Sequence, residues 1–139
     1  MDNIEKLTRE LGKAIQLDER YINFVNARQD NEKDEELNTL LGQVQLIHMN
    51  YGREAQKGDE ADQDKLDKFE KEFNEIFSRV KNHPTMVNYE NARDELDSLM
   101  KYVTGILSMC ALGEDPETCD PSSQNSSCSG DCSACGGCN

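Results

Sequence analysis

The amino-acid sequence predicts an all-α protein, an antiparallel helical hairpin or bundle with short N-terminal helices and a disordered, cysteine-rich C-terminal tail. In residues 1–112 apolar side chains recur every three or four positions, as they do on one face of a helix. All 27 Leu, Ile, Val and Phe residues lie in this part, so residues 113–139 lack the side chains that build a core. We therefore expect a helical domain over residues 1–112 and a flexible Ser-, Gly- and Cys-rich tail over residues 113–139.

The first two expected helices are short. Asp2 or Asn3 can cap the first, because such side chains accept hydrogen bonds from the free amides at a helix start. Asp18 can cap the second, which ends in the polar residues 29–31. The apolar positions are Ile4, Leu7, Leu11, Ala14 and Ile15 in the first helix and Tyr21, Ile22, Phe24 and Val25 in the second. We expect both helices to pack on the longer ones that follow.

Two longer amphipathic segments predict the hairpin. The first begins after Asp34 and ends before Gly58, since glycine commonly terminates helices. The second begins near Asp62 and reaches Lys81. Their apolar stripes are Leu37, Leu40, Leu41, Val44, Ile47, His48 and Tyr51, and Leu66, Phe69, Phe73, Ile76, Phe77 and Val80. Because only a short link joins the two segments, we expect antiparallel neighbours.

A fifth helix is expected from Pro84, because proline is favoured in the first turn of a helix. From Ala92 to Cys110 its apolar residues are spaced alternately four and three apart, the pattern of a seam between helices. Gly113 ends this helix, and Pro116 prevents it from resuming. The helices together leave broad apolar stripes, so we expect a homo- or hetero-oligomer.

The net charge of −13 divides into −8 for residues 1–112 and −5 for residues 113–139. Neither part has the basic face that phosphate contacts need, which argues against direct nucleic-acid binding. No run approaches 18 apolar residues, and the N-terminus lacks the basic and apolar regions of a secretory signal. We therefore expect a cytoplasmic protein without a membrane segment, whose six cysteines favour metal ligands or reactive thiols over disulfides.

The strongest candidate site is a run of four thiols, Cys128, Cys132, Cys135 and Cys138. Thiolates select zinc, copper(I) or iron–sulfur clusters, and the intervening Ser and Gly residues let the backbone fold around a metal. The order of gaps is the reverse of that in bacterial ferredoxins, and a zinc site normally pairs its ligands across a longer insert. Metal or cluster ligation and a tail of free thiols are the two interpretations.

Other candidate residues are isolated. Cys119 is a candidate further metal ligand, whereas Cys110 continues the apolar seam and is expected to be a small buried residue, or else to face a cluster at the helix end. We expect His48, on an apolar helical face, to be buried or at the boundary, and His83 to be a cap or a surface residue. The sequence contains no motif of a hydrolase, a metalloprotease or a nucleotide-binding loop. We therefore expect no catalytic residue and no enzyme.

Two patterns of helix-packing residues occur in the helical part. The first is Ile4-x2-Leu7-x3-Leu11-Gly12-x-Ala14-Ile15, followed by Glu19-x-Tyr21-x2-Phe24-x2-Ala27. The second is Pro84-x2-Val87-x-Tyr89-x2-Ala92-x3-Leu96-x2-Leu99-x3-Val103, and the tail closes on Cys135-Gly136-Gly137-Cys138. Over residues 3–110 these patterns resemble the YlbF/YmcA family of bacterial regulators, and the tail resembles those of its YlbF branch.

The resemblance implies an all-helical, oligomer-forming accessory protein and not a catalyst. It implies partners of the YlbF/YmcA and YaaT types in a cytoplasmic complex that carries [4Fe–4S] clusters. That complex assists RNase Y in processing messenger RNA and influences competence, sporulation and biofilm formation. By position, Cys128, Cys132, Cys135 and Cys138 are the candidate cluster ligands. The alternative function is a thiol-rich zinc- or copper-binding module, or a metal buffer.

Overall fold

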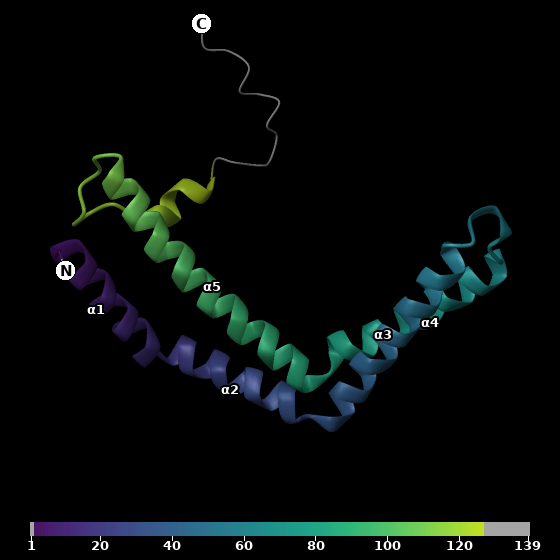
Figure 1. Cartoon of the computed structure of the whole chain (residues 1–139). Helices are drawn as coiled ribbons and strands as arrows, with labels where there is room; N and C mark the ends of the chain where they lie inside the picture. Colours follow the sequence, from purple (N-terminus) through teal and green to yellow (C-terminus); the bar gives the residue numbers. More distant parts are fainter. Residues whose placement is uncertain (1, 127–139) are drawn as a thin grey trace, which may run out of the picture. The chain divides into compact units, whose positions relative to one another are not determined.

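A computed structural model describes the backbone of residues 2–126 and the side chains of residues 2–123. Its helices are α1 (Asn3–Leu17), α2 (Glu19–Lys33), α3 (Glu35–Ala55), η1 (Gly58–Glu60), α4 (Gln63–Asn82), α5 (Pro84–Ala111) and η2 (Pro121–Ser126), shown in Figure 1. No strand occurs within residues 2–126, so the predicted all-α class is confirmed. The chain packs as two compact units that divide between Leu96 and Asp97, inside α5.

The helix starts are set by aspartate caps. The side chain of Asp2 accepts a hydrogen bond from the amide of Glu5, and that of Asp18 accepts one from Arg20. Asp34 and Asp62 cap α3 and α4 in the same way. Each cap satisfies an amide that the helix itself leaves unpaired, which is worth about 1 kcal/mol. The expected caps at Asp2 and Asp18 are therefore confirmed, and α3 begins after Asp34 as expected.

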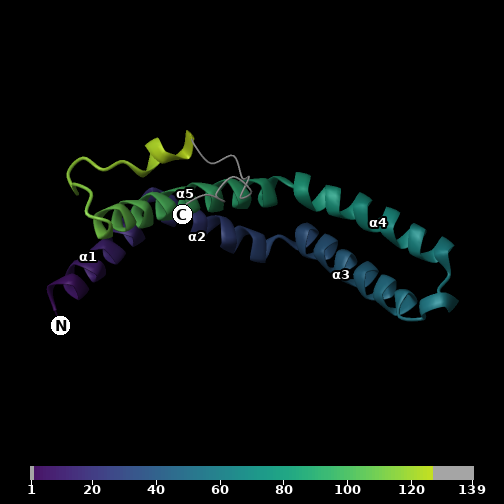
Figure 2. The ribbon, with the colours of Figure 1, turned by 90° about the horizontal axis from the view of Figure 1, so that it is seen from above.

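Helices α3 and α4 form the predicted antiparallel hairpin, and the two ribbons run side by side in Figures 1 and 2. The core of the first unit lies at the base of this hairpin, where Leu37 and Leu40 of α3 pack with Val80 of α4. Leu37 is completely buried. Half-buried neighbours extend this cluster, namely Val44, Ile76 and Met86. The 3–4 spacing of the two stripes predicted this contact because it places those side chains on facing helix surfaces.

A buried carboxylate closes the other end of the hairpin. Oε1 of Glu54 accepts a hydrogen bond of 2.8 Å from the amide of Asp62, and Oε2 lies 2.8 Å from Nζ of Lys57. The hydrogen bond from Lys57, followed by that from the Asp62 amide, lowers the pKa of Glu54. Gly58 adopts a φ of 61°, which a side chain would strain, so the chain turns at the glycine that the sequence marked as the stop.

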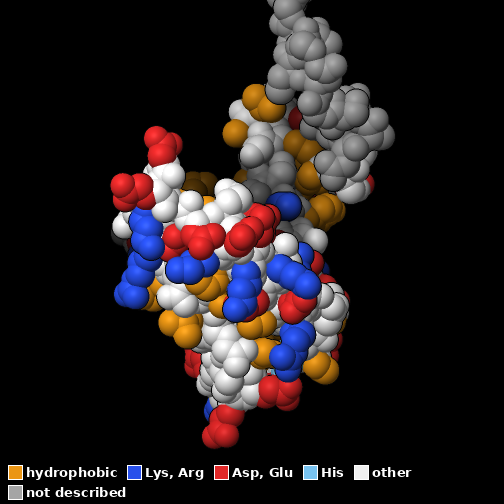
Figure 3. Space-filling model, turned by 90° about the vertical axis from the view of Figure 1, so that its right-hand side faces the viewer, with side chains coloured by type: hydrophobic (Ala, Val, Ile, Leu, Met, Phe, Trp, Pro, Cys, Tyr) orange, Lys and Arg blue, Asp and Glu red, His pale blue; other side chains and the backbone are white. Residues whose placement is uncertain are grey.

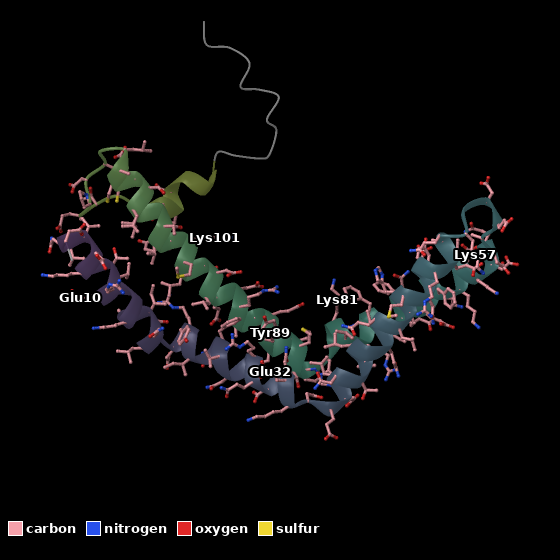
Figure 4. All side chains as sticks on the ribbon, in the orientation of Figure 1. Glu10, Glu32, Lys57, Lys81, Tyr89 and Lys101 are labelled. Carbon is pink, nitrogen blue, oxygen red and sulfur yellow. The ribbon has the colours of Figure 1, made fainter. Side chains whose placement is uncertain are left out.

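The start of α5 packs near α2 within the first unit. The rings of Phe24 and Tyr89 lie 5.6 Å apart, and Figure 4 shows Tyr89 on the side of α5 that faces α2. Ala27 and Ala92 are both buried, and the two helices line a common polar pocket there. Helix α1 has no buried residue, and its principal helix neighbour is α2. The expected packing of α1 on the hairpin is therefore not found among its main contacts.

In the second unit the chain folds back after α5. Gly113 adopts a φ of 93°, its amide donates to the carbonyl of Cys110, and the amide of Glu114 donates to that of Met109. This pairing satisfies the last carbonyls of the helix and confirms Gly113 as its end. The returning chain then packs Pro121 against Gly105. Residues 113–126 have turns and a 3-10 helix, and the rest of the expected flexible tail, residues 127–139, lies outside the described residues.

Candidate functional site

Of the five predicted ligand cysteines, only Cys119 lies in the described part of the chain. Cys128, Cys132, Cys135 and Cys138 lie outside it, so their assembly into one site stays a prediction. The neighbourhood of Cys119 is built entirely from the second unit.

Cys119 is half-buried, and so is Cys110 in the last turn of α5. The amide of Cys119 donates a hydrogen bond of 2.9 Å to the carbonyl of Asp115, which holds the returning chain in a turn. Burial raises the pKa of the Cys119 thiol, and its hydrogen bond to Cys110 raises the pKa further. The thiolate form of Cys119 is therefore disfavoured, because burial removes the solvent that would stabilise its charge.

Cys110 was expected to be a small buried residue of the α5 seam. It is instead half-buried, in the last turn of α5, and the alternative that it faces a cluster at the helix end stays a prediction. The two thiols supply only two soft ligands. Among residues 2–123 no three His, Cys, Asp or Glu side chains lie close enough together to hold a metal ion. Any metal centre that includes Cys119 therefore needs ligands from elsewhere.

A polar cluster that sequence analysis did not identify joins α3 to the α4–α5 junction. Oγ1 of Thr85 donates a hydrogen bond of 2.6 Å to Oδ2 of Asp34, whose Oδ1 accepts from the amide of Leu37. The hydrogen bond from Thr85, followed by that from the amide, lowers the pKa of Asp34. No local sequence signal predicts this pair, because its members are 51 positions apart.

His83 completes the cluster and confirms the expectation that it is a cap. Its Nδ1 accepts a 3.3 Å hydrogen bond from the amide of Thr85, in the first turn of α5. Its Nε2 lies 3.8 Å from Oδ2 of Asp34 and 3.7 Å from Oε2 of Glu36. The side chain is only 11% exposed, so His83 is not a surface residue. These contacts fix the position at which α4 ends and α5 begins.

A shallow apolar pocket of about 310 Å³ lies between α3 and α4. It is lined by Ile47, His48, Tyr51, Phe69, Glu70, Phe73 and Asn74. His48 was expected to be buried or at the boundary, but the structure exposes it, although it contributes to the lining of this pocket. The pocket holds a single imidazole and a single carboxylate, which do not constitute a metal site by themselves.

The described surface carries many large apolar side chains in contact with water. On α1, the exposed fractions are 72% for Ile4, 52% for Leu7 and 80% for Leu17. On the hairpin, Leu46 and Met49 are also more than half exposed. The face shown in Figure 3 accordingly has hydrophobic side chains interspersed with cations and anions. Exposed apolar groups gathered on one helix face are typical of protein–protein contact surfaces.

No helix in the described part of the chain is both long and apolar enough to cross a membrane. No curated protein and no solved structure matches the chain. One family model matches, that described as control of competence regulator ComK, YlbF/YmcA, over residues 4–109. The match covers well over half of the chain and includes every helix from α1 to nearly the end of α5. The chain therefore belongs to the YlbF/YmcA family, a family of regulatory proteins.

Proposed function

We propose that this protein is a non-enzymatic regulatory factor of the cytoplasm, in which the helical part binds partner proteins and the cysteine-rich tail binds an iron–sulfur cluster. The observation that supports this most directly is the exposure of apolar side chains on the helices that the family model covers. A helix such as α1, with a strong apolar stripe and no buried residue, gains stability only when another surface covers that stripe.

The proposed partners are other YlbF/YmcA-type and YaaT-type proteins, in a homo- or hetero-oligomer that supports messenger RNA processing by RNase Y. Through that processing the complex would influence competence, sporulation and biofilm formation. The acidic chain supports an indirect role in RNA metabolism, because a net charge of −13 opposes contact with phosphates. A basic partner would supply the RNA contact.

The proposed cofactor is a [4Fe–4S] cluster held by Cys128, Cys132, Cys135 and Cys138, with Cys119 as a further candidate ligand. The donor set fits such a cluster, because four closely spaced thiolates are its usual protein ligands. Residues 113–139 contain no Lys or Arg, so no cation of the tail favours the thiolate forms. The bound metal, or a basic partner surface, would supply that positive charge.

Anaerobic affinity purification of the full chain tests partners and cofactor together. We expect brown protein with iron and acid-labile sulfide in comparable amounts, accompanied by the proposed partners. The matched variant replaces Cys128, Cys132, Cys135 and Cys138 with Ser, and we expect it to lose iron and keep its partners. Iron-free protein, both alone and in the complex, would overturn the cluster. Co-purification of none of the partner types would overturn the regulatory complex.

A zinc- or copper-binding module remains the alternative, and the reversed order of cysteine gaps relative to ferredoxins favours it. A chain that ends at Ser126 discriminates between the two, because it removes the four tail thiols and keeps the fold-back that contains Cys119. The alternative predicts stoichiometric zinc or copper without sulfide in the full chain and none in the shortened chain. Iron with sulfide in the full chain would exclude it.

A further inference from the structure

Helices α2 and α5 carry the same pattern of residues, which the proposed function does not use. In α2 the pattern is Asn23-Phe24-x-Asn26-Ala27-Arg28-x-Asp30, and in α5 it is Asn88-Tyr89-x-Asn91-Ala92-Arg93-x-Glu95. In each copy the guanidinium lies 5.9 Å from the centre of the aromatic ring four positions earlier. The two copies therefore share a local structure as well as a sequence pattern.

The two copies lie side by side and run in opposite directions. Helix α5 begins where α2 ends, because Thr85 in the first turn of α5 donates its hydroxyl to Asp34, the residue that follows α2. Figures 1 and 2 show the start of α5 returning along α2. Equivalent residues meet, since the ring centres of Phe24 and Tyr89 lie 5.6 Å apart. Antiparallel copies that meet through equivalent residues are related by an approximate twofold axis.

The pocket between these copies has a volume of about 350 Å³ and lies within the first unit. The buried Ala27 and Ala92 contribute apolar methyl groups to its lining. Its other lining side chains are polar and come equally from the two helices, namely Asn23, Asn26 and Asp30 of α2 and Asn88, Asn91 and Glu95 of α5. Because the copies are antiparallel, the carboxylates of Asp30 and Glu95 lie toward opposite ends of the pocket.

These polar side chains have unused hydrogen-bonding capacity. Within the part of the chain that the structure describes, none of the four asparagine side chains makes a hydrogen bond, and neither carboxylate forms an ion pair. Arg20 attracts Glu95 at longer range, but its Nε and Nη2 both donate to Asp18 at 2.8 Å. Asparagine is also a poor helix former, so four of them on facing helices lower the stability of those helices. A ligand that hydrogen-bonds to them would offset this cost.

The charge and the symmetry of the pocket define the ligand that fits it. The lining has two carboxylates and no Lys or Arg, and Lys33 lines the adjoining pocket beyond Asp30. A matching ligand is therefore cationic, with an ammonium group at each end and donors between them for the asparagine oxygens. Asp30 follows Asn23 by seven residues, which spans about 10 Å along an α-helix, so a short diamine would not reach both ends.

We propose that this pocket binds a linear aliphatic polyamine, whose terminal ammonium groups pair with Asp30 and Glu95. The inner amines donate to the side-chain oxygens of Asn26 and Asn91, and the methylene groups lie over the alanine methyls. Such a ligand joins α2 to the first half of α5. The site is separate from the cysteine-rich tail and requires neither a metal nor a partner protein.

Isothermal titration calorimetry of the full chain with spermidine tests the proposal, and the shorter diamine putrescine is the comparison. Both titrations contain excess Mg²⁺, which suppresses the general attraction of polyamines to a chain with a net charge of −13. We expect spermidine to bind at one site per chain, at least about tenfold more tightly than putrescine, because each charge-assisted contact adds affinity. Absence of saturable spermidine binding, or equal affinities for the two amines, would overturn the proposal.

A pair of double variants separates the pocket from the remaining acidic surface. Asp30→Asn with Glu95→Gln removes both carboxylates of the pocket, and we expect spermidine affinity to fall at least tenfold. Asp59→Asn with Glu60→Gln removes the same charges from exposed positions of η1, and we expect less than a twofold change. Circular dichroism checks that both chains remain helical. Equal losses of affinity in the two double variants would show that spermidine binds the acidic surface in general, which contradicts the proposed site.

Discussion

The hydroxyl of Thr85 donates a 2.6 Å hydrogen bond to Oδ2 of Asp34 and so ties the first turn of α5 to the capping residue of α3. The other oxygen of the same carboxylate, Oδ1, accepts a hydrogen bond from the amide of Leu37. One side chain therefore serves as a helix cap and as a tertiary contact. His83 packs beside it, at the residue where α4 ends.

Replacement of Thr85 by Val tests the tertiary part of this arrangement. The substitution keeps the shape of the side chain and removes its hydrogen bond to a carboxylate, which should cost about 1.5 kcal/mol of unfolding free energy. Urea denaturation measures this loss. Thr39→Val is the control, because the hydroxyl of Thr39 bonds only to the carbonyl of Glu35 within its own helix. Equal effects of the two substitutions would show that the contact with Asp34 contributes nothing.

The buried carboxylate of Glu54 predicts a loss of stability in acid. Its pKa is lowered by the hydrogen bond from Lys57 and then by that from the Asp62 amide. A group whose pKa is lower in the folded state stabilises the fold above its unfolded pKa, and this stabilisation disappears as the pH falls through the folded pKa. We expect Glu54→Gln to be less stable than the parent at pH 7, and we expect the difference to shrink toward pH 3.

Unfolding free energies measured from pH 7 to pH 3 check this dependence. Glu60→Gln is the control, because it removes the same charge from an exposed position of η1. We expect its curve to run parallel to that of the parent. A constant gap between Glu54→Gln and the parent across this range would contradict the assigned role of the Glu54 charge.

Replacement by alanine is expected to change the stability of the chain differently at Gly105 and at an ordinary helical glycine. Alanine at Gly12, where nothing lies within 4 Å of the added Cβ, should stabilise α1 by up to about 1 kcal/mol through helix propensity. Alanine at Gly105 would collide with Pro121 and push the returning chain away from α5. We expect Gly105→Ala to gain no stability and to make Cys119 react faster with a thiol reagent.

Alkylation rates read by mass spectrometry on the cleaved chain measure this second effect. All variants also lack Cys128, Cys132, Cys135 and Cys138, so that only Cys110 and Cys119 can react with the reagent. Gly12→Ala should leave the rate unchanged. If Gly105→Ala also left it unchanged, Pro121 would not be holding the chain that carries Cys119.

If the apolar face of α1 binds the proposed partners, a charged side chain on this face should prevent that association without unfolding the chain. Leu7 is 52% exposed, so Leu7→Glu should change the unfolding free energy by less than about 0.5 kcal/mol. A charge at the centre of a buried interface is costly, so the variant should lose its proposed partners or its self-association. Sedimentation and anaerobic co-purification measure these losses, and Lys6→Glu on the adjacent position is the control. Unchanged association of Leu7→Glu would place the partner surface elsewhere.

Sequence analysis predicted the local structure well, for physical reasons that are themselves local. Asp2, Asp18 and Asp34 begin helices because a carboxylate reaches an amide two or three residues ahead. Gly113 ends α5 because its positive φ completes the final turn. The 3–4 spacing likewise predicted the contact of Leu37 with Val80, since an amphipathic stripe has one face to bury.

The candidate site was predicted in composition but not in arrangement. The sequence singled out the thiols as candidate ligands and placed Cys110 in the fifth helix and Cys119 in the tail. The spacing of apolar residues in that helix could not indicate that the tail folds back onto it. That return depends on Pro121 reaching Gly105, a contact between residues sixteen positions apart across a turn. The apolar-face argument also misplaced His48, because helical spacing alone does not say how far a partner helix covers the stripe.

Hydrogen bonding within a turn and the helical period act over a few residues, so the sequence alone predicts the helix class, the helix starts and stops, the hairpin and the family pattern. Long-range packing alone brings Thr85 to Asp34 and Pro121 to Gly105. Those contacts depend on where long-range packing places whole segments, and many sequences with the same local pattern would place them differently.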